Sequence, residues 1–169
     1  MDIIEYIRRQ IAAARRTSDG AMQDITEEQL NWLPPSTANS IKATLLHTLT
    51  SEDDFIQVLI QEKPSLWDSG SWSKKIGLAI PPGRDGGWEE IKAATLPLAP
   101  VLAYGQAVRQ ATDAYVATLS AGDLDREVKI ANQTLLVAAL LVMLANHSSS
   151  HAGEIAAIKG IQGVKGLPY

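Results

Sequence analysis

The sequence predicts an all-α fold, a four-helix bundle with a long connector between the second and third helices. Four segments carry apolar side chains at helical spacing, and alternating strand patterns are faint. A stretch rich in proline and glycine, 64–100, separates the first two helical segments from the last two. The chain has 169 residues, 46% of them apolar, which suits one domain over 1–169 with a core of its own.

The first helix is predicted over 2–19, because Gly20 follows it and its apolar residues recur at helical spacing: Ile4, Ile7, Ile11 and Ala14. A short turn of helix is expected next, with Thr26 as its N-cap and Gln29 three residues on. Pro34 and Pro35 then end regular structure.

The second helix is predicted to begin at Asn39 or Ser40, both good N-cap residues, and to end before Pro64. Its main apolar stripe is Ile41, Leu45, Leu49, Ile56 and Ile60.

The connector 64–100 holds five of the eight prolines, five of the twelve glycines and three of the four tryptophans. So many tryptophans argue against disorder, and one short helix is expected over 87–96. Two roles stay open for Trp67, Trp72 and Trp88: they wall a substrate pocket, or they pin the connector to the helices.

The third helix is predicted over 101–119, followed by a turn in which Gly122 is a candidate C-cap residue. Residues 126–131 form at most one short extended piece. The fourth helix is predicted to begin near Asn132 or Thr134, to continue to about Lys159 and to end at Gly160. Its apolar run 135–145 has eleven residues, too few to span a bilayer.

Composition excludes some kinds of chemistry and argues against some classes of partner. There is no cysteine, so disulfides, thiolate metal sites and a cysteine nucleophile are excluded. The net charge of −4 and the lack of a basic tract argue against nucleic-acid and anionic-membrane partners. The N-terminal stretch lacks a signal-peptide pattern, and a cytoplasmic location is expected on that ground.

Two of the three histidines, His147 and His151, lie four residues apart, just after the apolar run 135–145. In a helix they lie about 40° apart on one face, close enough for both imidazoles to reach one metal ion. Glu154 falls on the same face and is a candidate ligand, a hydrogen-bond partner that orients a histidine, or a general base. Buried histidines that simply satisfy each other's hydrogen bonds are the alternative. The zincin motif does not apply, since serine and not glutamate follows the first histidine.

The third histidine, His47, lies in the middle of the second helix but off its apolar stripe. By helical projection it shares a face with Thr44, Ser51, Asp54 and Val58. Periodicity therefore leaves two alternatives open: His47 points to the rim of a polar cleft, or it is exposed and has no role.

Three motifs, "NSIKATLLHTLTSEDDF", "DGGWEEI" and "HSSSHAGEIAAIKGIQGVKGLPY", together resemble the DinB-like (DinB/YfiT-like) metalloenzyme family over nearly the whole chain. The matching residues are His47, Glu52, His147, His151, Gly153, Glu154, Ile155, Gly163, Gly166 and Pro168. The resemblance implies an up-down-down-up helical bundle and one divalent metal ion bound by His47, His147 and His151. Water or substrate would complete the shell, and zinc, nickel and iron all suit such ligands.

The resemblance also implies a function. Some relatives are transferases or isomerases that act on a small-molecule substrate with a low-molecular-weight thiol, and relatives often form homodimers. A metal-dependent, thiol-using transferase or isomerase is therefore the first hypothesis, with zinc or nickel as the preferred metal. The alternative is a metal-binding or stress-induced helical protein without enzymatic activity.

Overall fold

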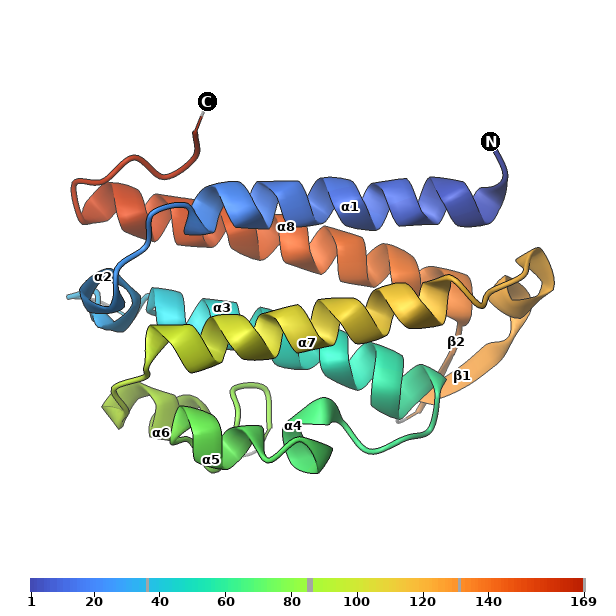
Figure 1. Ribbon diagram of the computed structural model, residues 1–169, viewed down its shortest axis with the longest axis horizontal. Coiled ribbons are helices and arrows are strands. Elements are labelled where there is room, and N and C mark those ends of the chain that lie inside the picture. The colour runs from blue at the N-terminus through green and yellow to red at the C-terminus, as the bar shows by residue number, and fades with distance from the viewer. Residues whose placement is uncertain (36, 85–86, 131, 169) are drawn as a thin grey trace.

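The computed structural model describes residues 1–35, 37–84, 87–130 and 132–168, and it is mostly helical. Four long helical segments lie side by side (Figure 1), and a chain of shorter elements flanks them. Asp85 and Gly86 of the second motif, Ala131 of the expected extended piece and the terminal Tyr169 lie outside the described residues. The long segments are α1 (Ile3–Met22), α3 (Ile41–Asp53) with its π-helical continuation η1 (Asp54–Ile60), α7 (Leu98–Val116) and α8 (Val137–Ile161).

The long helices run in two opposite directions. In Figure 1, α1 and α8 run in the same direction, while α3 and α7 both run in the opposite one. α1 packs along α8, and α3 packs against both α8 and α7. α3 is therefore covered on several sides, which explains why nearly all of its residues are buried.

The first helix and the short turn of helix that follows it begin where the sequence predicts. The Asp2 side chain caps α1 by accepting from the backbone N–H of Glu5 at 2.8 Å. The expected capping box of Thr26 and Gln29 is confirmed at the start of α2 (Glu27–Asn31). α1 differs only at its end, which lies beyond Gly20. A Cβ at Gly20 would lie 3.0 Å from Pro168, so the glycine is needed where the C-terminal tail crosses the helix.

In its described residues, 64–84 and 87–100, the connector contains three short helices rather than one: α4 (Leu66–Ser69), α5 (Trp72–Ile76) and α6 (Gly87–Ala93). The buried carboxylate of Asp53 accepts from the backbone N–H groups of Leu66 and Trp67, each at 2.9 Å, and so holds the first turn of α4 against α3. The rings of Trp67 and Trp72 both pack on Tyr104 of α7 at 5.4 Å. These two tryptophans therefore pin the connector to the long helices.

A small hairpin precedes α8, where the sequence predicted helix. Strands β1 (Glu127–Ile130) and β2 (Gln133–Leu136) pair antiparallel, and a 3₁₀ helix, η2 (Ala121–Asp125), leads into them. The predicted start of the fourth helix at Asn132 or Thr134 is therefore wrong, because that stretch pairs with β1. Gly122 lies inside η2 and does not cap α7, whose C-cap is Ala117.

α8 ends later than predicted, at Ile161. Gly160 lies within the last turn, and Gly163, with φ +78°, makes the left-handed turn that stops the helix. Within the described ranges, no helix is both long and apolar enough to cross a membrane.

Buried charged groups join the long helices. Arg15 of α1 donates to Glu52 of α3 at 2.9 Å and to Asp113 of α7 at 2.6 Å, and Thr112 of α7 donates to Glu52 at 2.7 Å. Lys159 of α8 is almost fully buried and donates to the carbonyls of Ala21 and Gln23 at the end of α1. The core itself consists of two apolar clusters, one at each end of the long helices.

Candidate metal centre

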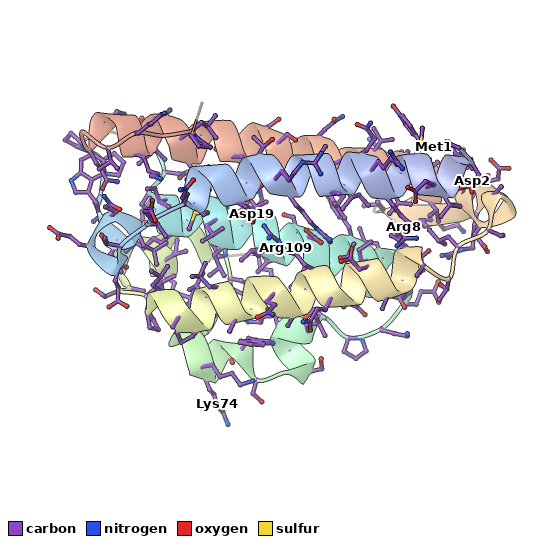
Figure 2. All side chains as sticks on the ribbon, turned by 45° about the horizontal axis from the view of Figure 1, so that its top comes forward. Met1, Asp2, Arg8, Asp19, Lys74 and Arg109 are labelled. Atoms are coloured by element: carbon purple, nitrogen blue, oxygen red, sulfur yellow. The ribbon has the colours of Figure 1, made fainter. Side chains whose placement is uncertain are left out.

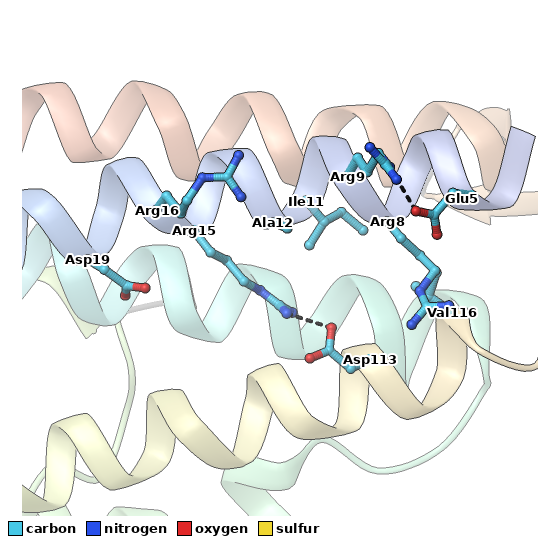
Figure 3. Close-up of a pocket in the computed structure, with 10 residues that line it drawn as sticks. All are labelled: Glu5, Arg8, Arg9, Ile11, Ala12, Arg15, Arg16, Asp19, Asp113 and Val116. Atoms are coloured by element: carbon cyan, nitrogen blue, oxygen red, sulfur yellow. Dashed lines mark hydrogen bonds and ion pairs between the residues drawn. The ribbon is translucent and has the colours of Figure 1, made fainter. Parts of the chain in front are cut away.

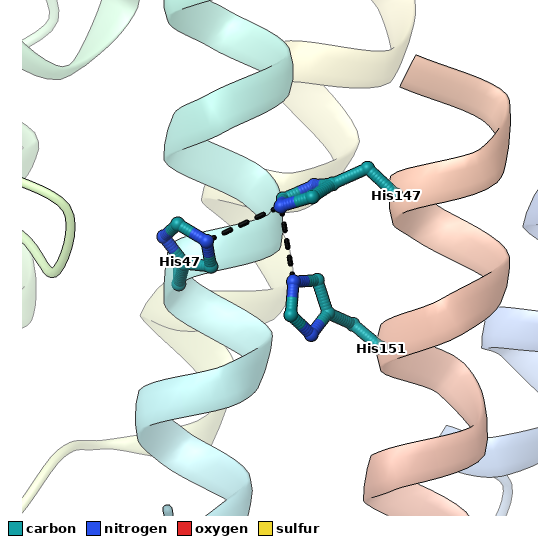
Figure 4. A group of neighbouring side chains, drawn as sticks. All are labelled: His47, His147 and His151. Carbon is teal, nitrogen blue, oxygen red and sulfur yellow. Dashed lines mark hydrogen bonds between the residues drawn. The ribbon is translucent and has the colours of Figure 1, made fainter. Parts of the chain in front are cut away.

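The three histidines converge between α3 and α8 (Figure 4). His47 projects from the middle of α3, and His147 and His151 project from successive turns of α8. Nε2 of His147 lies 3.2 Å from Nε2 of His47 and 3.0 Å from Nε2 of His151. One nitrogen from each ring lies within 4.8 Å of the others, an arrangement that could hold a metal ion.

His47 is half-buried, as are the rings of His147 and His151. A pocket of about 560 Å³ lies along the same face of α3, beginning one helical turn beyond His47, and is lined by Ser51, Asp54 and Val58. Phe55 also lines this pocket, and its ring lies 6.3 Å from that of His147. Three of the residues that sequence projection placed on the face of His47 therefore line one pocket, although His47 itself is not among the residues that line it.

Glu154 orients one of the rings. Its Oε2 lies 2.8 Å from Nδ1 of His151, one turn back on α8. The carboxylate favours the tautomer of His151 with the proton on Nδ1, and that tautomer turns the lone pair of Nε2 toward the other two rings. Glu154 thus acts on His151 through a hydrogen bond and lies on the side of the ring away from the convergence point.

The centre favours neutral imidazoles. Burial, followed by the neighbouring His151 and His47, lowers the pKa of His147 from 6.5 to about 4. Burial and then His151 also lower the pKa of His47, and a nearby carbonyl of Pro82 and Glu154 only partly oppose this. A neutral imidazole is the form that binds a metal ion, so the chain prepares these ligands at neutral pH.

The spacing of the nitrogens fits a metal ion. With metal–nitrogen bonds of about 2.0–2.1 Å, two ligands of a tetrahedral ion lie about 3.3 Å apart, and adjacent ligands of an octahedral ion lie about 2.9 Å apart. The two measured separations, 3.2 and 3.0 Å, fall between these values. With the proton of His151 held at Nδ1, hydrogen bonds alone cannot satisfy three converging Nε2 atoms, whereas a cation can.

Other polar residues of the motifs do not reach the centre. Ser148 is buried against α1, where its Oγ lies 2.9 Å from that of Ser18. Ser149 and Ser150 are exposed. Glu52, which follows His47 by five residues, is engaged with Arg15 and Thr112 on another face of α3. Its match to the family motif therefore reflects a helix contact and not a metal ligand.

Two residues of the connector lie near the centre, and only the second, Trp88, was a candidate from the sequence. Gly83, with φ +97°, lies against His47, and a Cβ there would approach Nδ1 to 3.1 Å. Trp88 of α6 packs its ring 5.1 Å from that of His47, so this tryptophan, unlike Trp67 and Trp72, belongs to the surroundings of the centre. The sequence signal for Gly83 was only its place in a turn-rich stretch, which does not say what the turn approaches.

A second charged region lies between α1 and α7, away from the histidines. Asp19 and Arg109 point toward each other across these helices (Figure 2) and pair at 2.6 Å. Next to them a groove of about 500 Å³ (Figure 3) is lined by four arginines and three carboxylates, and Arg15 extends across it to Asp113. Because most of these charges are paired with one another, the groove serves chiefly to hold α1 to α7.

The fold and the three converging imidazoles define a helical protein with a candidate metal centre between two of its long helices. A family model described as the DinB superfamily matches residues 10–155, a range that contains all three histidines. The chain belongs to the DinB superfamily.

One solved structure shows the same fold. It is the crystal structure of a conserved protein from Enterococcus faecalis, with a TM-score of 0.81 and 18% identity, and the match covers 96% of this chain and 99% of that chain. Among curated proteins, none matches this sequence significantly.

Proposed function

We propose that the protein binds one divalent metal ion through His47, His147 and His151, and that it is a metal-dependent transferase or isomerase. The observation that carries this proposal is the convergence of three Nε2 atoms at ligand-like separations of 3.0 and 3.2 Å. In the described part of the chain, no fourth metal-ligating side chain joins this group. A site with three protein ligands that is reached from a pocket is typical of catalytic metal centres.

The ligand set favours zinc or nickel. Imidazole nitrogen suits both ions, and the affinity order of the divalent metals alone does not choose between them. Three neutral imidazoles leave the full positive charge of the ion in place. That charge would lower the pKa of a bound thiol and hold its sulfur beside an electrophile.

The thiol would come from outside the chain. The sequence contains no cysteine, so the protein has no thiolate nucleophile of its own. A low-molecular-weight thiol used with a small-molecule substrate supplies this nucleophile and agrees with the chemistry of some relatives in the superfamily. The pocket along Ser51 and Asp54 begins one helical turn beyond His47, and such molecules would approach the centre from this side.

The fold supports this proposal through rigid placement of the ligands. We propose that the four long helices form a four-helix bundle of one domain, with the ligands on two facing helices, as in other metal-binding bundles. His147 and His151 are fixed relative to each other by the helix itself. His47 is fixed by packing, with Trp88 and Gly83 against its ring.

Elemental analysis of the purified protein tests the metal site. One equivalent of zinc or nickel per chain is expected, and His147→Ala and His151→Ala should each reduce it to near zero. Asn146→Ala is the matched control, since Asn146 is an exposed neighbour on α8 and should leave the stoichiometry unchanged. Circular dichroism should show unchanged helix in all three variants, and full metal occupancy in a folded histidine variant would refute the ligand assignment.

Spectroscopy of the cobalt-substituted protein tests the enzymatic part. Addition of a small thiol should produce a sulfur-to-cobalt charge-transfer band, and that band should be missing in His151→Ala. If neither thiol nor water reaches the ion, the alternative of a structural metal-binding protein replaces the enzyme.

A further inference from the structure

A separate apolar pocket lies against the candidate metal centre. It has a volume of about 370 Å³ and is formed by the α2–α3 loop, the start of α3 and one face of α6. Its volume falls within the range of small-molecule sites. The residues that define its walls and rim are Leu33, Pro34, Asn39, Ala43, Trp88 and Lys92.

The pocket and the centre share a wall. Trp88 lines the pocket, and its ring packs 5.1 Å from the ring of His47. Ala43 lines the pocket one helical turn before His47, at the spacing that places two side chains on the same face of a helix. A molecule in this pocket would therefore lie one side chain away from the three imidazoles.

The walls of the pocket are mostly apolar, and among the described residues that line it the only charged side chain is that of Lys92. Leu33 is 53% exposed, and it lines the pocket together with Pro34 and Trp88. Among the described residues that line the pocket, none is acidic, although the chain as a whole has a net charge of −4. Lys92 stands at the rim, so the pocket is complementary to an apolar molecule with one negative charge.

Lys92 is available to such a molecule. Its Nζ pairs with Glu89 at 2.9 Å, but both side chains are mostly exposed, with 60% and 81% of their surface in solvent. Exposed pairs of this kind contribute little and exchange partners readily. Lys42 of α3 differs from Lys92 because it is buried. It donates to the carbonyls of Lys92 and Ala94 and so fixes the end of α6.

We propose that this pocket binds the apolar body of the protein's small-molecule substrate, a singly anionic organic molecule whose negative charge lies at Lys92. The link to catalysis rests on the function proposed above, because only a metal centre beside the pocket makes the bound molecule a substrate. The pocket itself requires no metal, which allows the two proposals to fail separately.

The test uses 8-anilinonaphthalene-1-sulfonate, an aromatic molecule with one negative charge whose fluorescence rises in apolar surroundings. Titration of the full chain should show one saturable site with and without metal. Leu33→Ser should weaken binding by about fivefold through lost apolar contact. Val142→Ser is the matched control, because Val142 is 56% exposed on α8 and lies outside the pocket, and it should leave the affinity unchanged.

A second pair of measurements isolates the charge. Lys92→Gln should weaken binding of the anionic probe by about threefold to fivefold at low salt, and it should not weaken binding of the neutral analogue N-phenyl-1-naphthylamine. Equal losses for both probes would show that Lys92 does not recognise the negative charge, and this would overturn that part of the proposal.

The outcomes also separate the pocket from the metal site. If His151→Ala loses the metal but keeps the probe affinity, the pocket stands on its own. If Leu33→Ser binds the probe as tightly as the unchanged protein, or if Val142→Ser weakens binding equally, the proposed pocket is refuted whatever the metal content.

Discussion

Replacement of Glu154 by glutamine should weaken metal binding while leaving the three ligands in place. The side chain contacts Nδ1 of His151 at 2.8 Å, so an ion held at Nε2 would lie about 6–7 Å from the carboxylate. The substitution keeps an oxygen acceptor of the same shape for the Nδ1 proton. It removes only the negative charge, which makes the expected change an electrostatic one.

The expected loss of metal affinity follows from the distance between the carboxylate and the ion. At about 6.5 Å, a unit charge and a divalent ion attract by about 1.3 kcal/mol at the dielectric constant of water and by about 2.5 kcal/mol at an effective value of about 40. Glu154 is 53% exposed, which favours the lower figure. We therefore expect about a tenfold loss of affinity, within the range of about 10–100-fold that is typical of residues that support metal-bound histidines.

Competition with a chromophoric chelator measures the affinity directly. Glu28→Gln is the control, since Glu28 is an exposed residue of α2 and its replacement makes the same change in net charge. The difference between the two variants should shrink as salt is added. Affinities that agree within twofold would refute the argument and leave Glu154 with only a local role on α8.

Four further results are expected. Glu52→Gln should lower the free energy of unfolding by about 1–3 kcal/mol, because it disturbs a buried contact with Arg15. The variant should keep one metal ion per chain, and loss of the metal would contradict the assignment of Glu52 to a helix contact. Urea unfolding of the metal-free protein should show a loss of about 1–2 kcal/mol in the free energy of unfolding between pH 6.5 and pH 5, because the pKa of His147 is 6.5 when unfolded and about 4 when folded, so the unfolded state binds more protons in this window; His147→Gln should reduce this loss and leave the part that comes from His47, whose pKa is also lowered by burial. Lys159→Ala should cost about 2–3 kcal/mol, since two buried carbonyls lose their donor, whereas the exposed Lys165→Ala should stay within about 0.5 kcal/mol. Sedimentation at micromolar concentration should show a homodimer, and a single species at the chain mass of 18.2 kDa would contradict it.

The histidine pair was predictable because its geometry is local. A spacing of four residues within one helix fixes the relative positions of His147 and His151, whatever the rest of the fold does. The same holds for the cap at Thr26, whose partner Gln29 lies three residues away. Such features depend on the chain's own short-range geometry, and the structure confirms this cap.

His47 could not be assigned from periodicity, for a physical reason. Helical projection identifies inward-facing residues when one face of a helix is buried and the other is exposed to solvent. α3 is covered by α7, α8 and the connector, so its polar residues Thr44, Glu52 and Asp53 are as buried as its apolar ones. A helix of this kind has no single inward stripe, and only the resemblance to a family singled out His47.

Helices α4 and α5 of the connector and the second strand of the hairpin escaped prediction because their partners are distant in sequence. The first turn of α4 is held by Asp53, thirteen residues before Leu66, and its Trp67 packs on Tyr104 of α7. In the hairpin, Val128 pairs with Leu135 and is buried, which outweighs the helical preference of the residues after Asn132. In both places tertiary contacts override local propensity.

The placement of Glu52 shows how the fold positions His47. These two residues lie on the same helix but on different faces, and each contacts a different neighbour: His47 approaches α8, whereas Glu52 joins Arg15 of α1 and Thr112 of α7. The contacts of Glu52 restrain the rotation of α3 about its axis. A rotation of one residue, about 100°, would take the ring of His47 away from the two imidazoles of α8. Glu52 and the histidines therefore depend on the same helix orientation, and this gives the glutamate five residues after His47 a role in the fold although it lies outside the group of three histidines.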